Sequence, residues 1–144
     1  MASRIVPFEP WHVRLLEGRK AERESTYDIG WQAHQVGNYP GLTLVVADKP
    51  IACAGLVTMW PGVAEAWAYL SPAVEHRAVA LHRQVKRALL MGERHLNLHR
   101  IQAAVRCDFV VGYRWLERLG FEPEGLMHKY GPRKESYMRF ARVR

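Results

Sequence analysis

The stretch CDFVVGYRWLERLGFEPEG, residues 107–125, changes from helical to extended periodicity at a single glycine. Asp108 is expected to cap the helix, because its side chain can accept hydrogen bonds from the free N–H groups of the first turn. Apolar residues then recur at helical spacing at Val111, Trp115 and Leu119. Gly120 can adopt the left-handed conformation that ends helices. The stretch therefore predicts a helix that ends at Gly120 and a strand that begins near Phe121.

Length and composition indicate one globular domain over residues 1–144. The chain is 49% hydrophobic and 24% charged, which is ordinary for a folded domain with one core. No apolar run approaches the roughly 18 residues of a membrane span, and the opening MASRIVPFEP lacks the apolar core of a secretory signal. We therefore expect a soluble protein located in the cytoplasm.

The two cysteines and seven histidines show no spacing typical of metal ligands. Cys53 and Cys107 fall on expected strands, outside any CxxC pattern, and are interpreted as buried free thiols. His95 and His99 are four residues apart, but the chain has no HExxH motif. We expect no metal site.

The positive charge lies in the second half of the chain. The formal net charge is +7; residues 1–74 contribute −1 and residues 75–144 contribute +8. This charge favours an anionic partner that binds the second half of the chain. The alternative is a basic surface that only keeps the protein soluble. Nucleic-acid binding is the least favoured reading, because the expected basic helix face lacks interleaved aromatic residues for stacking on bases.

Periodicity and turn signals predict a complete order of elements. Strands are expected at 4–8, 42–47, 51–59, 63–70, 100–107, from 121, and at 135–143; helices are expected at 10–16, 27–36, 74–95 and 108–119. Tight turns are expected at 37–41, 48–50 and 60–62. Strand 63–70 alternates strictly, with Ala64, Ala66, Ala68 and Leu70 on one face. The order favours a mixed sheet with helices on its faces.

The C-terminal part of the opening stretch resembles a known family phrase. Trp115 to Phe121, with Gly125, is similar to "L-Y-E-K-L-G-F-x-x-x-G" of the GCN5-related N-acetyltransferase (GNAT) superfamily. The order of elements also follows that fold over nearly the whole chain. The resemblance implies an α/β (α+β) fold with a mixed, mostly antiparallel sheet of about six or seven strands and helices on both faces.

The resemblance also implies a site for the diphosphate of acetyl-CoA. Leu70, Ser71 and Pro72 match the strand end "V-x-P" of the family, and the loop "Q/R-x-x-G-x-G/A" falls on residues 75–80. The implied cofactor-binding residues are Leu70, His76, Arg77, Ala78, Val79 and Ala80. Two positions depart from the pattern: Ala78 replaces the first glycine, and Glu75 replaces Gln or Arg.

Catalysis in the family uses a base, a tyrosine acid and a backbone N–H of the bulged fourth strand that polarises the acetyl carbonyl. By resemblance, Glu65 is the candidate base; its alternative is a solvated position. Leu116 stands where the family has its tyrosine, so Tyr113, one turn earlier, is the candidate acid; its alternative is a packing role. Trp60, Trp67 and Trp115 are interpreted as core or wall residues.

Two functions follow from the resemblance. The first is an acetyl-CoA-dependent N-acetyltransferase acting on an unidentified amine, carried by a small molecule or a protein. The second is a degenerate GNAT-fold module that binds a phage virion or host protein. Residues 50–132 also resemble small GNAT-like proteins of tailed phages and prophages, of the internal virion protein A type. That narrower resemblance adds virion association as an expected location, and a homodimer is compatible with it.

Overall fold

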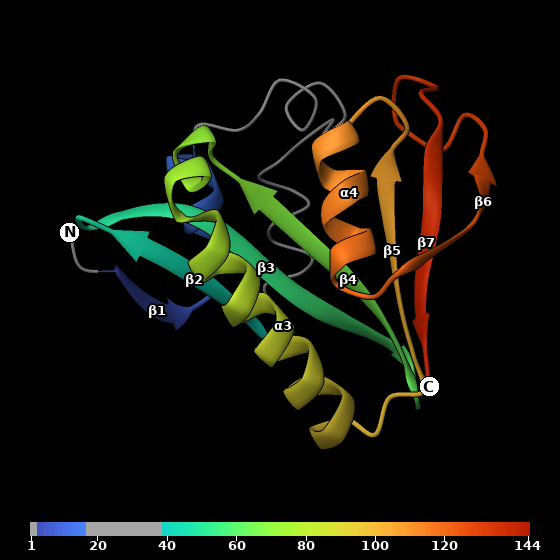
Figure 1. The fold of residues 1–144 in the computed structure, drawn as a ribbon, viewed down its shortest axis with the longest axis horizontal. Helices are drawn as coiled ribbons and strands as arrows, with labels where there is room; N and C mark the ends of the chain where they lie inside the picture. Colours follow the sequence, from blue (N-terminus) through green and yellow to red (C-terminus); the bar gives the residue numbers. More distant parts are fainter. Residues whose placement is uncertain (1–2, 17–38) are drawn as a thin grey trace.

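Seven strands form one mixed sheet in the computed structural model, which describes residues 3–16 and 39–144 (Figure 1). The strand order is β1-β2-β3-β4-β5-β7-β6. Every neighbouring pair is antiparallel except β4 and β5, which run parallel. The strands are β1 (Ser3–Pro7), β2 (Gly41–Val46), β3 (Lys49–Trp60), β4 (Val63–Leu70), β5 (Arg100–Arg106), β6 (Glu122–Met127) and β7 (Tyr137–Val143). The predicted fold class is confirmed.

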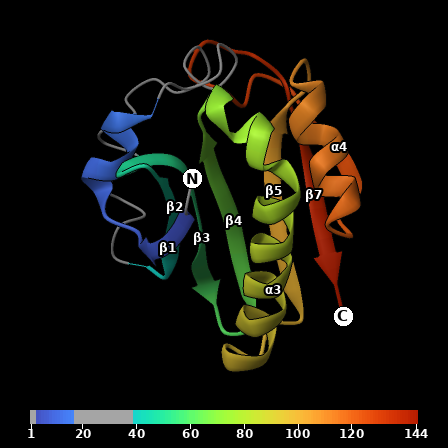
Figure 2. The same cartoon turned by 60° about the vertical axis from the view of Figure 1, so that its left-hand side comes forward.

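Helices cover both faces of the sheet. The helices α3 (Ala78–His95) and α4 (Val110–Arg118) lie on one face (Figure 2). The 3-10 helix η1 (Pro10–Leu15) packs on the other face, and a second 3-10 helix, η2 (Pro72–Arg77), leads directly into α3. The predicted helix at 27–36 lies outside the described residues.

The main core fills the space between the sheet and the helices α3 and α4. The apolar stripe of α3 is buried there, at Leu81, Val85 and Leu89. Alternate residues of the central strands meet this stripe, among them Ala64 and Leu70 of β4 and Ile101, Ala103 and Val105 of β5. The alanine face of β4 thus packs toward the helices. A smaller cluster on the opposite face joins Phe8, Val13 and Cys53 to Trp67 and Tyr69.

The glycine of the opening stretch ends α4 as predicted. Gly120 has a φ of +89°, which a side chain would strain. The N–H of Gly120 donates to Glu117 O, and the N–H of Phe121 donates to Leu116 O, both at 3.0 Å. These two bonds are the Schellman pattern, which satisfies carbonyl groups that the helix end leaves free.

The start of α4 differs from the prediction. Its N-cap residue is Phe109, and no side chain caps it. The carboxylate of Asp108 instead accepts two hydrogen bonds from Arg106, each 2.6 Å long. These charge-assisted bonds lower the pKa of Asp108. The prediction that Asp108 caps the helix is wrong, because a stronger donor occupies its side chain.

Other local predictions need correction as well. The helix expected from residue 74 begins at Ala78, because the preceding residues form η2. The hairpin turn is formed by Ala47 and Asp48, both with positive φ, rather than by 48–50. Cys107 is an exposed free thiol, whereas Cys53 is buried as predicted. Burial raises the pKa of Cys53 to about 11.

Candidate functional site

The parallel strands β4 and β5 pair over only three residues and then diverge. Val63, Ala64 and Glu65 of β4 are in register with 100–102 of β5, and no later pair follows. Figure 1 shows the two strands separating toward the end of the sheet where α3 begins. Along the edge of β4 that faces β5, the backbone from Ala66 to Ala68 therefore has no strand partner among the described residues.

A cavity of about 880 Å³ lies at this divergence. One part of its lining comes from the face covered by α3 and α4, namely Ala66, Ala68, Leu70, Val85, Trp115 and Leu116. The other part comes from the opposite face, namely Glu65, Trp67, Tyr69, Ala104, Arg106 and Tyr137. The space between β4 and β5 is thus lined from both faces of the sheet.

The regular register of β4 differs from the family pattern. Pairing with β3 runs without a shift from Ala52↔Leu70 to Thr58↔Ala64. The only shift in this pair of strands lies between Thr58 and Trp60, on β3. The bulge implied for the fourth strand is absent from this pairing.

The N-terminus of α3 lies directly after the end of β4. Ser71 closes the strand and accepts a hydrogen bond from Ala73 N–H in η2. The first residues of α3, Ala78, Val79 and Ala80, are exposed, and its first turn contains no acidic residue. Ala78 has ordinary helical dihedral angles, φ −57° and ψ −42°, so its backbone does not require glycine. The helix presents its positive end to solvent here, with His76 exposed beside it.

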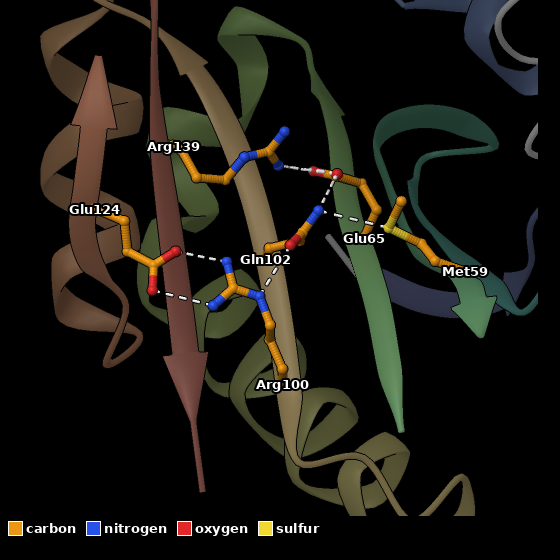
Figure 3. A network of polar contacts seen from close by, with 6 residues as sticks. All are labelled: Met59, Glu65, Arg100, Gln102, Glu124 and Arg139. Carbon is orange, nitrogen blue, oxygen red and sulfur yellow. Dashed lines mark hydrogen bonds and ion pairs between the residues drawn. The ribbon is translucent and has the colours of Figure 1, made fainter. Parts of the chain in front are cut away.

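Glu65 lies on the face opposite α3 and α4, inside a polar network (Figure 3). Arg139 of β7 donates to both of its oxygens at 2.9 Å, and Gln102 donates to Oε1 at 3.2 Å. Gln102 is itself oriented by Arg100, whose Nε donates to its Oε1 at 2.9 Å. Side chains of β5 and β7 therefore hold the Glu65 carboxylate of β4 in one place, and Arg139 compensates its charge.

The network continues to β6. Arg100 donates to both oxygens of Glu124. These bonds lower the pKa of Glu124 and raise that of Arg100. With its two terminal nitrogens directed at Glu124, Arg100 directs its Nε–H at Gln102.

The two candidate catalytic residues occupy different surroundings. Glu65 lines the cavity. Tyr113 does not line the cavity; its ring lies edge-on to Phe140, with ring centres 4.7 Å apart. Leu116 lines the cavity, and the neighbouring Trp115 donates its indole N–H to His82 Nδ1 of α3 at 3.3 Å. Of the implied cofactor-binding residues, Leu70 lines the cavity, whereas residues 76–80 lie outside it.

Sequence reasoning missed the residues that β7 and the preceding loop bring to the cavity. Arg139 reaches Glu65 from 74 positions along the chain. Tyr130 and Tyr137 line the cavity, with ring centres 5.2 Å apart. The alternation of β7 indicates that Tyr137 and Arg139 share a face, but only the strand order places that face beside β4.

Among residues 3–16 and 39–144, no three His, Cys, Asp or Glu side chains gather in a way that would hold a metal ion. Within the same residues, no helix is both long and apolar enough to cross a membrane.

Comparison with known proteins finds similarity in structure alone. No protein-family model matches the sequence, and no curated protein matches it. Ard1 from Thermoplasma volcanium has a TM-score of 0.78 at 15% identity, covering 99% of this chain and 98% of its own. A GNAT-family acetyltransferase from Bacillus anthracis has a TM-score of 0.73 at 16% identity, covering 98% and 94%. The structure of yncA from Salmonella typhimurium with its cofactor acetyl-CoA has a TM-score of 0.69 at 16% identity, covering 99% and 94%. At these identities the similarity establishes that the chain has the GNAT fold.

Proposed function

We propose that the protein is an acetyl-CoA-dependent N-acetyltransferase. The observation that carries this proposal is the cavity between the diverging strands β4 and β5, which is lined from both faces of the sheet and reaches Leu70, the last residue of β4. Such a cavity lets a thioester approach from the helical face and an amine from the other. The GNAT fold of the chain supports the same reading as an analogy.

The donor side suits a molecule with a diphosphate and amide groups. The exposed first turn of α3 offers backbone N–H groups and the positive end of the helix dipole to a diphosphate. His76 and Arg77 add basic side chains nearby. The β4 edge from Ala66 to Ala68 can pair with the amides of the pantetheine arm, as an added strand would.

The transfer itself needs little covalent chemistry from the protein. The amine nitrogen bonds to the acetyl carbon, the C–S bond breaks, and its electron pair leaves with the CoA sulfur. The amine loses one proton, and the thiolate gains one. A backbone N–H of β4 is the proposed donor to the acetyl oxygen as negative charge develops on it.

Glu65 is the proposed base. Its Oε2 accepts one hydrogen bond, from Arg139, and so keeps a lone pair for the amine proton. Tyr113 stays the candidate acid. The alternative for Tyr113 is a packing role, which its edge-on contact with Phe140 supports. Tyr113→Phe separates the two readings: slower release of CoA supports the acid role, and unchanged turnover removes it.

A second candidate is a catalytically degenerate module that binds a virion or host protein. Leu116 favours it, because an aliphatic side chain lines the cavity at the position of the tyrosine of the family. The resemblance of residues 50–132 to phage and prophage proteins supports a phage context for either candidate. We include in this proposal that the protein is located in the cytoplasm of the bacterial host cell or is associated with the virion.

Calorimetric titration of acetyl-CoA separates the two candidates. We expect wild-type protein to bind acetyl-CoA and Ala80→Glu to bind it far more weakly, because a carboxylate in the first turn of α3 repels a diphosphate. The helix itself tolerates that change, since acidic residues stabilise helix N-termini. Leu126→Glu, which adds the same charge on β6, is the control and should bind normally. Absence of binding by the wild type at hundreds of micromolar acetyl-CoA would refute the enzyme proposal.

A further inference from the structure

Four aromatic rings line the cavity on the sheet face opposite α3 and α4. We call them the aromatic chamber: Trp67, Tyr69, Tyr130 and Tyr137. Trp67 and Tyr69 come from β4 on one side of the divergence, with ring centres 5.7 Å apart. Tyr130 and Tyr137 come from the other side. The open space of this face is therefore bounded by rings on two sides.

The backbone register places Trp67, Tyr69 and Tyr137 on this face, and Tyr130 joins them through its packing against Tyr137. Trp67 and Tyr69 alternate with Ala66, Ala68 and Leu70, and the alanine face packs toward the helices. Tyr137 pairs directly with Arg106, and neighbours in register point to the same side of a sheet. Tyr130, about half exposed, packs edge-on against Tyr137 and leaves the chamber accessible from solvent.

Glycines on the neighbouring strands make room for the largest ring. A Cβ at Gly55 would lie 2.7 Å from Cζ2 of Trp67, and one at Gly41 would lie 3.3 Å from the same atom. The two glycines thus leave the space that the indole occupies. The Trp67 ring is therefore held in a defined position as one wall of the chamber.

The charged side chains beside the chamber are already compensated. Glu65 is paired with Arg139 (Figure 3), whose Nη1 lies 2.9 Å from its Oε1. Arg106 is paired with Asp108 at 2.6 Å. A molecule with several positive charges would meet no unpaired carboxylate among these side chains, whereas a flat apolar body would meet ring faces and edges.

We propose that the aromatic chamber selects an acceptor amine attached to an aromatic, otherwise uncharged body, and that it discriminates against polyamines. This inference presupposes the proposed acetyl transfer for its biological meaning. Its physical content is a binding preference, which can be measured without acetyl-CoA.

Binding is measured by calorimetry with three probes: 2-phenylethylamine, n-butylamine and spermidine. We expect 2-phenylethylamine to bind more tightly than the other two. Tyr130→Ala removes a half-exposed ring. It should weaken the binding of 2-phenylethylamine about three- to tenfold and change the binding of n-butylamine little. Tighter binding of spermidine than of 2-phenylethylamine, or no binding of 2-phenylethylamine, would overturn the proposal.

Arg139→Gln supplies a reciprocal test. It uncovers the charge of Glu65, so the affinity for spermidine should rise about fivefold relative to 2-phenylethylamine. Arg118→Gln, which removes the same charge from an exposed position of α4, should leave this ratio unchanged. Equal effects of the two variants would contradict the role given to charge compensation.

The outcomes also separate this inference from the proposed function. If 2-phenylethylamine binds and acetyl-CoA does not, the chamber stands and the transfer reaction fails. If acetyl-CoA binds and is consumed with spermidine but not with 2-phenylethylamine, the reaction stands and the chamber is refuted.

Discussion

Replacing Glu93 by leucine is expected to destabilise the fold strongly. Glu93 of α3 is 5% exposed, and its Oε1 lies 2.6 Å from Nε of Arg142, which is 20% exposed. Arg142 also donates to Leu119 O at 2.6 Å, at the C-terminal end of α4. One guanidinium on β7 therefore holds both helices of the main core.

The magnitude follows from the burial of the pair. Removing one partner of a buried ion pair costs about 3–5 kcal/mol, because the other charge is left uncompensated. Arg142 is one-fifth exposed and keeps its bond to Leu119, so Glu93→Leu should lower the free energy of unfolding by about 2–4 kcal/mol. For a chain of this length, that corresponds to a fall in Tm of about 5–15 °C.

The assay is thermal unfolding followed by circular dichroism, with urea titration for the free energy. The double variant Glu93→Leu/Arg142→Leu should be at least about 1 kcal/mol more stable than the sum of the single effects predicts, because neither charge is then stranded. Arg4→Leu is the control: its pair with Asp48 is 64% and 95% exposed, so the loss should stay below about 1 kcal/mol. A loss under about 1 kcal/mol for Glu93→Leu, or strictly additive effects in the double variant, would refute the reasoning.

Three further predictions concern single sites. Gly120→Ala should cost about 1–2 kcal/mol, because φ is +89° there, whereas Gly125→Ala, with nothing within 4 Å of the added Cβ, should change stability little; urea unfolding compares the two. Burial lowers the pKa of His12 below 6.5, so its contribution to stability is complete above pH 6.5 and is lost as the pH falls below that value. Between pH 7.5 and 5.5 the melting temperature should therefore fall more steeply for the wild type than for His12→Gln. An equal fall for both proteins would contradict this prediction. Gly55→Ala should cost about 1–3 kcal/mol and shift the tryptophan fluorescence, since its methyl would lie 2.6 Å from Pro40 O and 2.7 Å from Trp67; an unchanged spectrum would argue against that contact.

The parts of the fold that depend on near neighbours could be predicted from the sequence. Gly120 ends α4 because its conformation and the two Schellman bonds involve residues within five positions of one another. The buried stripe of α3 and the alternation of β4 follow from the periods of the helix and the strand. Even here, a neighbouring side chain could override a local preference: Arg106 takes the Asp108 carboxylate that was expected to cap α4.

The candidate site could be predicted only in part. The alternation of β4 puts Glu65 on the face opposite Ala64 and Ala66, and Glu65 lines the cavity. Its partner Arg139 and the ring of Tyr137 could not be assigned, because β7 reaches the neighbourhood of β4 only through the order in which the sheet is assembled.

By itself, the sequence determined the approximate bounds of the described strands and helices and the buried faces of α3 and β4. Their periods, caps and turns are properties of short segments of backbone. The tertiary structure alone decided that β4 and β5 separate after Glu65, that Arg139 compensates this carboxylate, and that four rings from distant positions bound one cavity. These features depend on strand order and on contacts across the sheet, where residues far apart in the chain become neighbours.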